Sequence, residues 1–410
     1  MRDARMAWVL CCGSLLAWAP PLSAETYPTP VPAPFTIALP GTNDAPAQPH
    51  FAFDGHGNSI RVWSLGTFGP GKPLVTDVMG ELADAHGTAR GAAFQVNTYP
   101  PSGEYYPAVA MNRRGRGVVA WQSLQQDGQQ SGIYAQIYTP AGARFGGEIK
   151  VSPVIPRQSA NQPSVGIDRA GNFVVAWWSA QASVVASFVR LFDAHGVARG
   201  PEIRLSPAPM ASNPAVAMRP DGSFAVVWRS WKQTGAGAQI FGRCFDAAGT
   251  PLGPELQINQ TLIPGDGTPV VAAMPDGGLM VAWDSIDFKH TELGGAVRAR
   301  RLTATGAPLS AELAVSPPDS RVHWYPAVAA DGLGNSAVSW DNCLISGNLV
   351  VDCGISILFS DPMGRPDPTL WTIRDSQGDL FDATVTAQPG GFVVGLTSSA
   401  GIYGLSFLFM

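Results

Sequence analysis

The chain has 410 residues, of which 45% are hydrophobic and only 14% are charged, and its formal net charge is −5. Globular proteins average about 25% charged residues. The apolar content is sufficient for a large core, which excludes collagen-like and disordered chains. The sequence holds no basic cluster that could follow a phosphate backbone, so nucleic acid is not an expected partner. The 46 glycines and 36 prolines predict many short strands joined by tight turns.

Residues 1–24 have the pattern of a secretory signal peptide. Arg2 and Arg5 precede an apolar run from Met6 to Trp18, and cleavage is expected near Ala24. The run is too short for a transmembrane helix, which needs about 20 apolar residues, and no later segment reaches that length. We therefore expect an exported protein, periplasmic or secreted, that has no transmembrane segment and is monomeric.

An internal repeat follows the short Pro-rich segment 25–34 and predicts the fold. Six segments begin at a proline and end at a tryptophan 14 residues later, with a glycine six residues before the tryptophan. A seventh copy at 382–396 keeps the spacing and its glycine, Gly390, but lacks the proline and the tryptophan. The six complete segments are Pro49–Trp63, Pro107–Trp121, Pro163–Trp177, Pro214–Trp228, Pro269–Trp283 and Pro326–Trp340.

Each repeat is expected to form four strands. A short strand of small residues such as 107–111 precedes an apolar strand such as 173–177, and two further strands resemble 133–138 and 148–151. The second strand is apolar at nearly every position, which indicates that both faces of its sheet are covered. Four-stranded units of about 55 residues are typical of β-propellers. A linear β-solenoid would also stack repeats, but its exposed ends would need caps.

The two ends of the repeat region predict a closed ring. The seventh repeat supplies strands at about 383–387, 391–397 and 402–409 and then lacks a fourth strand. The isolated strand 35–38 precedes Pro49 at the spacing of a fourth strand. We therefore predict an all-β fold, a seven-bladed β-propeller of four-stranded antiparallel blades over residues 35–410, whose last blade is closed by the N-terminal strand.

The repeat resembles one found in large exported bacterial proteins. Its pattern, P-x-V-A-M then G-x-F-V-V-x-W-x-S and I-Y-A-Q-x-F-D, is present at 107–123 with 133–151 and at 214–230 with 239–259. The resemblance covers about 35–405. It implies a β-propeller but no particular activity, and the sixth and seventh repeats depart furthest from the pattern.

The cysteines suit an oxidising compartment. Cys343 and Cys353 lie ten residues apart around Gly347, as expected for a disulfide across the base of a hairpin loop. A metal or redox pair is the alternative, but the pair lacks CxxC spacing and a nearby histidine. Cys244 lies in an apolar run and is expected to be a buried, unreactive thiol.

Motifs for catalysis and for metal or cofactor binding are missing from the sequence. There is no GxSxG, HExxH, Walker A or strand-associated GxGxxG motif, and no two of the six histidines have metal-ligand spacing. We therefore predict no metal and no cofactor. The repeated tryptophans are interpreted as packing residues between blades rather than as sugar platforms.

Variable loops on one face of the ring are the predicted binding surface. The connections from strand four to strand one and from strand two to strand three emerge on this face. Aromatic side chains beside Arg and Asn suit either sugar rings or a protein partner. The candidate binding residues are Tyr105, Tyr106, Arg157, Trp178, Trp231, Arg321, His323, Trp324 and Tyr325.

Two functions follow from this surface. The first is a non-catalytic binding or interaction module, with carbohydrate or protein as its ligand. The alternative is a glycoside hydrolase or polysaccharide lyase with carboxylates in the central cleft, since glycoside hydrolysis needs two carboxyl groups about 5–9.5 Å apart. The candidate acids are Glu104, Asp284, Asp287, Asp341 and Asp382. Convergence of two of them beside Arg321 or His323 would favour the enzyme, and an exposed apolar patch would instead favour a module of an envelope assembly.

Overall fold

The fold consists of strands and turns. A computed structural model of the chain describes residues 28–30, 35–38, 44–67, 75–99, 103–128, 130–155, 157–207, 210–231, 238–261, 263, 267–285, 295–346, 349–375 and 378–409. Within these ranges every regular element is a β-strand. The described residues accordingly include no helix of the length and apolarity that a membrane crossing requires.

The strands follow the predicted repeats. The N-terminal segment and the first two repeats contain β1 (Pro28–Pro30), β2 (Phe35–Ala38), β3 (Asp44–Phe53), β4 (Ser59–Thr67), β5 (Val75–Ala83), β6 (Phe94–Gln95), β7 (Glu104–Met111), β8 (Gly117–Leu124), β9 (Ser131–Tyr138) and β10 (Arg144–Lys150). The third and fourth repeats contain β11 (Ser159–Ile167), β12 (Phe173–Gln181), β13 (Val184–Phe192), β14 (Ile203–Arg204), β15 (Ala211–Met218), β16 (Phe224–Ser230), β17 (Gln239–Phe245) and β18 (Leu256–Gln257). The last three contain β19 (Pro269–Ala273), β20 (Leu279–Ser285), β21 (Ala296–Leu302), β22 (Leu313–Ala314), β23 (Val322–Ala330), β24 (Ser336–Ser346), β25 (Leu349–Ser360), β26 (Trp371–Ile373), β27 (Phe381–Gln388), β28 (Gly391–Ser398) and β29 (Gly401–Phe409).

Consecutive strands of a repeat pair antiparallel. β3–β6, β15–β18, β19–β22 and β23–β26 each form a four-stranded sheet. A single parallel bridge between Ser131 and Ser159 joins β7–β10 to β11–β14, so these two units count as one eight-stranded sheet. The last sheet holds β27, β28 and β29 together with β1 and β2.

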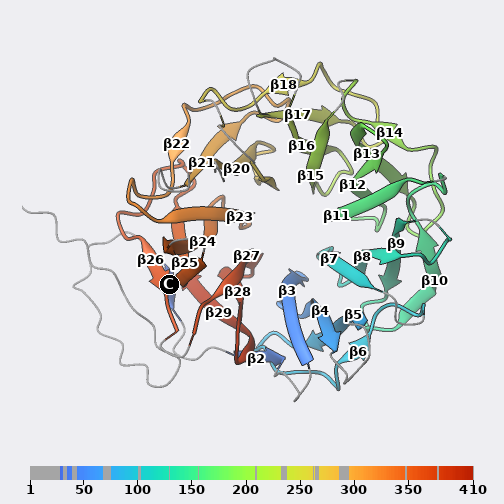
Figure 1. Cartoon of the computed structure of the whole chain (residues 1–410), viewed down its shortest axis with the longest axis horizontal. Coiled ribbons are helices and arrows are strands. Elements are labelled where there is room, and N and C mark those ends of the chain that lie inside the picture. The colour runs from blue at the N-terminus through green and yellow to red at the C-terminus, as the bar shows by residue number, and fades with distance from the viewer. Residues whose placement is uncertain are drawn as a thin grey trace, which may run out of the picture.

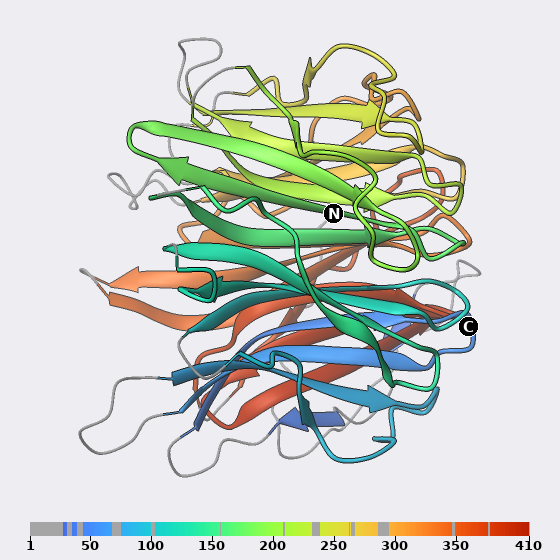
Figure 2. The ribbon, with the colours of Figure 1, turned by 90° about the vertical axis from the view of Figure 1, so that its right-hand side faces the viewer.

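The sheets are arranged around a central axis. Figure 1 shows the first strand of each unit innermost and the later strands towards the rim, and Figure 2 shows the same arrangement from the side. Each innermost strand contacts the next one around the axis, and β27 contacts β3. The innermost strands therefore bring one end of every unit to the same axial region.

The N-terminal segment pairs with the last strand, as the sequence predicts. Phe35 lies opposite Gly404, and Thr36 lies opposite Tyr403, in an antiparallel pair. The pairing extends further than expected, because β1, which lies in the predicted Pro-rich segment 25–34, pairs with the other end of β29 through Pro28 and Phe409.

Phe35 and Ile37 join the first unit to the last. The ring of Phe35 lies so close to Gly404 that a Cβ on that glycine would stand 2.2 Å from it. The Arg61 guanidinium of β4 lies 4.5 Å from the centre of the same ring. Ile37 packs in a cluster with Trp63 and Ile402. Apolar and cation–π contacts thus accompany the backbone pairing.

The repeated tryptophans lie between neighbouring units. Trp121, Trp228, Trp283 and Trp340 are fully buried, and Trp63 and Trp177 are nearly so. Trp228, for example, packs in a cluster with Val174 and Val189 of the preceding unit. Leu396, which replaces the tryptophan in the seventh repeat, packs against Ile355 and Ile357 of the sixth. The interpretation of these residues as packing residues is confirmed by their burial.

The predicted disulfide is present. Cys343 in β24 and Cys353 in β25 are joined, with their Cα atoms 4.1 Å apart. Both cysteines are buried, whereas Leu349, nearer the tip of the same hairpin, is 69% exposed. The bond therefore clamps the hairpin where it leaves the sheet. Cys244 is a buried free thiol, as expected.

We expect Trp228→Ala to destabilise the protein by about 3–5 kcal/mol, because it leaves a cavity between two units. Val197→Ala removes an apolar side chain that is 62% exposed and serves as the control. Its cost should stay within about 0.5 kcal/mol. Urea unfolding followed by tryptophan fluorescence measures both values, and an equal cost for the two variants would contradict the packing role.

Replacing both Cys343 and Cys353 with serine is expected to lower stability by about 2–3 kcal/mol, because the unfolded chain then loses its cross-link. The free energy of unfolding of the wild-type protein should fall by the same amount after reduction. Reduction should leave the double variant unchanged, and a shift in the reduced variant would count against this account.

Candidate functional site

A β-bulge interrupts the innermost strand just before the proline of each of five repeats. In β3 the register shifts between Ala47 and His50, and comparable shifts occur in β7, β11, β15, β23 and β27. The residue before the proline, or before Ala383 in the seventh repeat, has a positive φ. These residues, called the axial ring below, are Gln48 (57°), Tyr106 (52°), Gln162 (47°), Asn213 (51°), Tyr325 (48°) and Asp382 (57°).

The left-handed backbone of the axial ring is strained for residues with side chains and costs about 1–3 kcal/mol each. Hydrogen bonds from neighbouring units offset this cost. Asp341 accepts the N–H groups of Asp382 (3.2 Å) and Ala383 (2.9 Å). Asp284 accepts the N–H groups of Thr268 (2.5 Å) and Tyr325 (2.9 Å).

Similar hydrogen bonds, from a backbone N–H group to a side chain of the neighbouring unit, join the last unit to the first and the first unit to the second. The Gln48 N–H donates to Asp382 Oδ2 at 3.0 Å, and the Tyr106 N–H donates to Gln48 Oε1 at 3.2 Å. Hydrogen bonds therefore connect Asp341, Asp382, Gln48 and Tyr106 in sequence. Four innermost or adjacent strands, β24, β27, β3 and β7, are held together at this axial end.

Three of the predicted acids meet in this region. Asp284 and Asp341 are only 3% and 2% exposed, whereas Asp382 is half-buried. Burial, then the nearby charges of Asp284 and Asp341, raises the pKa of Tyr325. Tyr106 and Asp382 add to this effect. Tyr106 in β7 and Tyr325 in β23 come from units that are not neighbours around the axis.

Burial also shifts the pKa values of the carboxyl groups. It raises the pKa of Asp341 to about 8, and the Asp382 charge adds to this, although two backbone N–H donors favour the ionised form. Burial raises the pKa of Asp284 to about 6, against the N–H groups of Thr268 and Tyr325 and the Arg229 charge. Desolvation outweighs the hydrogen bonds in both cases.

Two pairs of aromatic side chains lie at the axial ring. Tyr106 and Tyr325 are 39% and 55% exposed. Tyr105 lies against Tyr106 with ring centres 6.4 Å apart, and Trp324 lies 5.7 Å from Tyr325. Each pair presents an exposed tyrosine at the axial ring.

Two further predicted aromatic residues border the ring. Trp178 Nε1 donates to Gln162 Oε1 at 2.8 Å, so this indole is fixed to the ring itself. The Arg229 guanidinium lies 5.7 Å from the ring centre of Trp231. Both tryptophans are half-buried.

Other predicted site residues lie elsewhere. Glu104 is fully buried, accepts a hydrogen bond from Ser123 at 2.8 Å, and has a pKa raised to about 8 by burial. The carboxylates that influence it are Glu148 and Asp77 rather than the axial acids. Arg157 is exposed. Asp287 lies outside the described residues.

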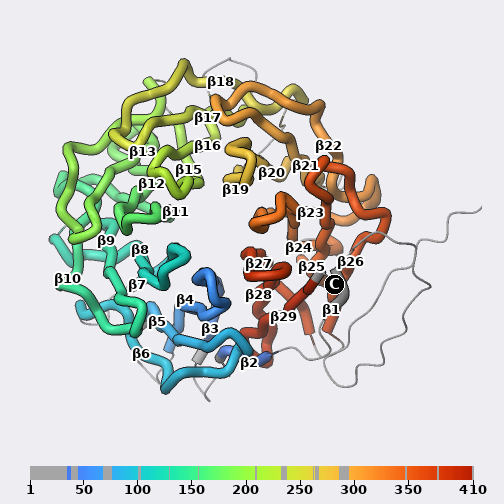
Figure 3. The backbone as a smooth tube through the Cα atoms, turned by 180° about the vertical axis from the view of Figure 1, so that it is seen from behind, coloured from blue at the N-terminus to red at the C-terminus, as the bar shows by residue number. Residues whose placement is uncertain are grey.

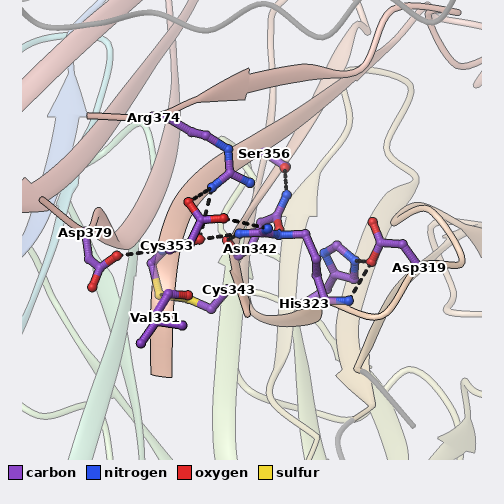
Figure 4. Close-up of polar contacts among 11 residues, drawn as sticks. Asp319, His323, Asn342, Cys343, Val351, Cys353, Ser356, Arg374 and Asp379 are labelled. Atoms are coloured by element: carbon purple, nitrogen blue, oxygen red, sulfur yellow. Dashed lines mark hydrogen bonds and ion pairs between the residues drawn. A yellow bond between two sulfur atoms is a disulfide. The ribbon is translucent and has the colours of Figure 1, made fainter. Parts of the chain in front are cut away.

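Arg321 and His323 belong to a network beside the disulfide, and Figure 4 shows His323, Asn342 and Arg374 of this network next to Cys343 and Cys353. Arg321 donates to Asp352 Oδ2 at 2.9 Å and to Asn342, and Arg374 donates to the other oxygen of Asp352 at 2.8 Å. The prediction that His323 lies on an exposed loop is wrong, because this residue is fully buried. Its Nδ1 accepts the Trp340 indole N–H at 3.0 Å, and its Nε2 lies 2.9 Å from Asp319.

The convergence expected of an enzyme is therefore met only in part. Asp284, Asp341 and Asp382 gather around Tyr325, but neither Arg321 nor His323 joins them. Gln48 and Asn213 were missed by sequence reasoning, which placed Gln162 on the variable loops but not among the candidate binding residues. The sequence does contain a signal for these positions. When the repeats are aligned on their prolines, the residue before each proline is polar or aromatic.

A metal is not needed to explain the site. Within the described ranges, no group of three or more His, Cys, Asp and Glu side chains could hold a metal ion. The oxygens of Asp284 and Asp341 accept backbone N–H groups instead. These two aspartates thus join neighbouring units, and the surface available to a ligand consists of Asp382, the tyrosines and the amide side chains.

Comparison with known proteins identifies the fold class as a β-propeller. The β-propeller domain of the trilobed protease from Pyrococcus furiosus is similar, with a TM-score of 0.50, 9% identity and coverage of 89% of this chain and 93% of that one. Penicillium chrysogenum α-L-arabinanase complexed with arabinobiose gives 0.50 at 11% identity, covering 93% and 99%. A PL25 polysaccharide lyase, ulvan lyase, gives 0.52 at 11% identity, covering 92% and 96%. A scan against protein-family models and a search of curated proteins each found no match.

The raised pKa of Asp341 predicts that stability falls as the pH rises. An unfolded aspartate titrates near pH 4, so between about pH 4 and pH 8 the folded protein holds a proton that the unfolded chain has lost. Asp341→Asn cannot ionise and removes this contribution. The unfolding midpoint of the variant, relative to the wild-type protein, should therefore increase from pH 5 to pH 8.

Asp246→Asn is the matched control for this measurement. Backbone hydrogen bonding, first from Thr250, lowers the pKa of Asp246 below its ordinary value. That carboxyl is therefore ionised in both states above pH 5, and its removal should leave a difference that does not change with pH. A constant difference for Asp341→Asn as well would show that this carboxyl is ionised throughout the range.

Proposed function

We propose that the chain is an exported, closed seven-bladed β-propeller that binds a carbohydrate over its axial ring. The pairing of β2 with β29 and the contact of β27 with β3 support a ring closed by the N-terminal segment. The disulfide is compatible with an extracellular compartment. The repeat pattern supports membership among the exported bacterial repeat proteins that it resembles.

The observation that carries this proposal is the pair of exposed tyrosines beside a half-buried carboxylate. Tyr106 and Tyr325 present aromatic faces that can stack on a sugar ring, and Asp382 and Gln48 offer acceptors and a donor for hydroxyl groups. The Tyr106 N–H is held by the side chain of Gln48, and the Tyr325 N–H is held by the carboxyl group of Asp284. The surface is therefore fixed before a ligand binds, which reduces the entropy cost of binding.

Cleavage of a glycosidic bond at the same ring is the second candidate. Burial raises the pKa of Asp341 to about 8, and this residue lies next to Asp382; glycoside hydrolysis uses a pair of carboxyl groups of which one has a raised pKa. Asp341 is buried and bonded to backbone, so Asp382 is the carboxylate that would meet substrate. Two of the proteins with a similar fold are named as an arabinanase and a polysaccharide lyase, which favours cleavage over a purely non-catalytic module.

A glycan-array screen followed by turnover assays on the hits tests this function. Tyr106→Ala and Tyr325→Ala should each weaken binding about tenfold, because a stacking contact of about 1–1.5 kcal/mol is lost. Leu333→Ala, which removes a side chain that is 72% exposed, is the control and should leave affinity unchanged. Unchanged binding in both tyrosine variants, or selective binding to a peptide rather than to glycans, would contradict the proposal.

Asp382→Asn separates cleavage from binding. The amide oxygen can still accept the Gln48 N–H, so the variant should retain glycan affinity within about threefold. If the ring cleaves its ligand, turnover should fall by at least about a hundredfold. Turnover that persists in this variant would show that Asp382 takes no part in the reaction. Glycan binding without turnover in the wild-type protein would contradict cleavage and support binding as the function.

A further inference from the structure

A second surface lies on the opposite face from the axial ring. The ring residues lie near the start of each innermost strand, whereas the turn to the next strand lies at its other end. A groove crosses these turns in the second, third and fourth units and is lined by Arg114, Arg169, Arg199, Asp168, Asn172 and Asp221. Figure 3 shows the ring from behind, with these three units (β7–β18) next to one another.

The backbone of the groove is held by contacts between units. The Asn112 side chain accepts the N–H of Arg114 at 3.0 Å and donates to the carbonyl of Asp168 at 3.2 Å. The N–H of Arg169 donates to the carbonyl of Pro220 at 3.1 Å. Arginines from the second and third units are therefore positioned on connected turns.

The groove carries an excess of positive charge. Arg114, Arg169 and Arg199 are exposed, and within the described part of the chain none of the three guanidinium groups forms an ion pair. Arg199 is anchored through one nitrogen, which donates to the carbonyl of Ala247 at 2.9 Å. A protein with a formal net charge of −5 thus presents three cations side by side.

The two aspartates of the groove do not neutralise these cations. Asp168 is buried, and its oxygens accept the backbone and side-chain N–H groups of Asn172 at 2.8 and 2.7 Å. Asp221 is exposed, and its Oδ1 accepts the N–H and hydroxyl of Ser223 at 2.9 and 2.7 Å. The exposed charges that line the groove are therefore three guanidinium groups and one carboxylate.

We propose that this groove binds an anionic polysaccharide through its sulfate or carboxylate groups. Guanidinium groups form paired hydrogen bonds with such oxyanions. Asp221, beside the arginines, supplies an acceptor for sugar hydroxyls, which a flat basic surface for a membrane would not need. The arginines come from successive units, so they suit charges repeated along an extended chain.

Binding of fluorescein-labelled dextran sulfate, measured by fluorescence anisotropy, tests the proposal. Arg169→Gln and Arg199→Gln should each weaken binding about tenfold, since each removes a charge-assisted contact. Raising the salt concentration from 50 to 300 mM should weaken binding strongly. Unlabelled neutral dextran should not compete.

Arg90→Gln is the matched control. Arg90 and Arg199 stand at the same position of the same D-A-H-G-x-A-R turn, at 84–90 and 193–199, and each N–H donates to a strand carbonyl at 2.8 Å. Arg90 is exposed but does not line the groove. Its replacement should change affinity less than twofold, and equal weakening in Arg90→Gln and Arg199→Gln would overturn the site.

Two other outcomes would also overturn the proposal. One is failure of dextran sulfate to bind the wild-type protein at low salt. The other is tighter, arginine-dependent binding to vesicles with 30% anionic phospholipid than to dextran sulfate, which would assign the groove to a membrane surface. Arginine-dependent binding of dextran sulfate and tyrosine-dependent binding of array glycans are separate measurements, so failure of this site is distinguishable from failure of the axial ring.

Discussion

Burial of the second strand of each unit between two neighbouring sheets is the constraint on which the rest of the structure depends. Such a strand is apolar on both faces, so each face of its sheet must be covered by a neighbouring sheet to be shielded from water. Trp228 shows this arrangement, because it packs in one cluster with side chains of the preceding unit as well as of its own. Truncating one such side chain to alanine costs about 3–5 kcal/mol. The units therefore stabilise one another, and the axial surface exists only where they meet.

The strained backbone at the axial ring follows from that packing. A bulge directs one residue of an innermost strand towards the axis, and carboxylates of neighbouring units offset its strain. Asp284 and Asp341 are held there by buried hydrogen bonds, and their role is to position Tyr325 and Asp382. Residues that would meet a ligand are thus placed by residues that would not. Chemistry at the ring depends on contacts between sheets rather than on any single repeat.

Much of the fold could be predicted because the repeat fixes which residues occupy equivalent places. The Pro–Trp spacing located the strands of the seventh unit to within about two residues, and the ten-residue spacing located the Cys343–Cys353 bond. The candidate site was harder to predict from the sequence than the fold. The bulge could not be inferred from a proline alone, since most residues of the axial ring donate their N–H groups to side chains of a neighbouring unit, which are far away in sequence. His323 was placed on a loop, whereas the need of the Trp340 indole for an acceptor holds it in the interior. Arg114, Arg169 and Arg199 are scattered in sequence and come together only when three turns align.

The contact between Gln48 and Asp382 has a kinetic consequence, because it joins residues separated by 334 positions in sequence. Loop-closure entropy makes contacts of such long range slow to form. β3 is translated long before β27, so a nascent polypeptide would wait for the strands of its last sheet before the two could associate. Until then, chaperones or proteases would encounter an unpaired β2 edge and the uncovered side of Trp63.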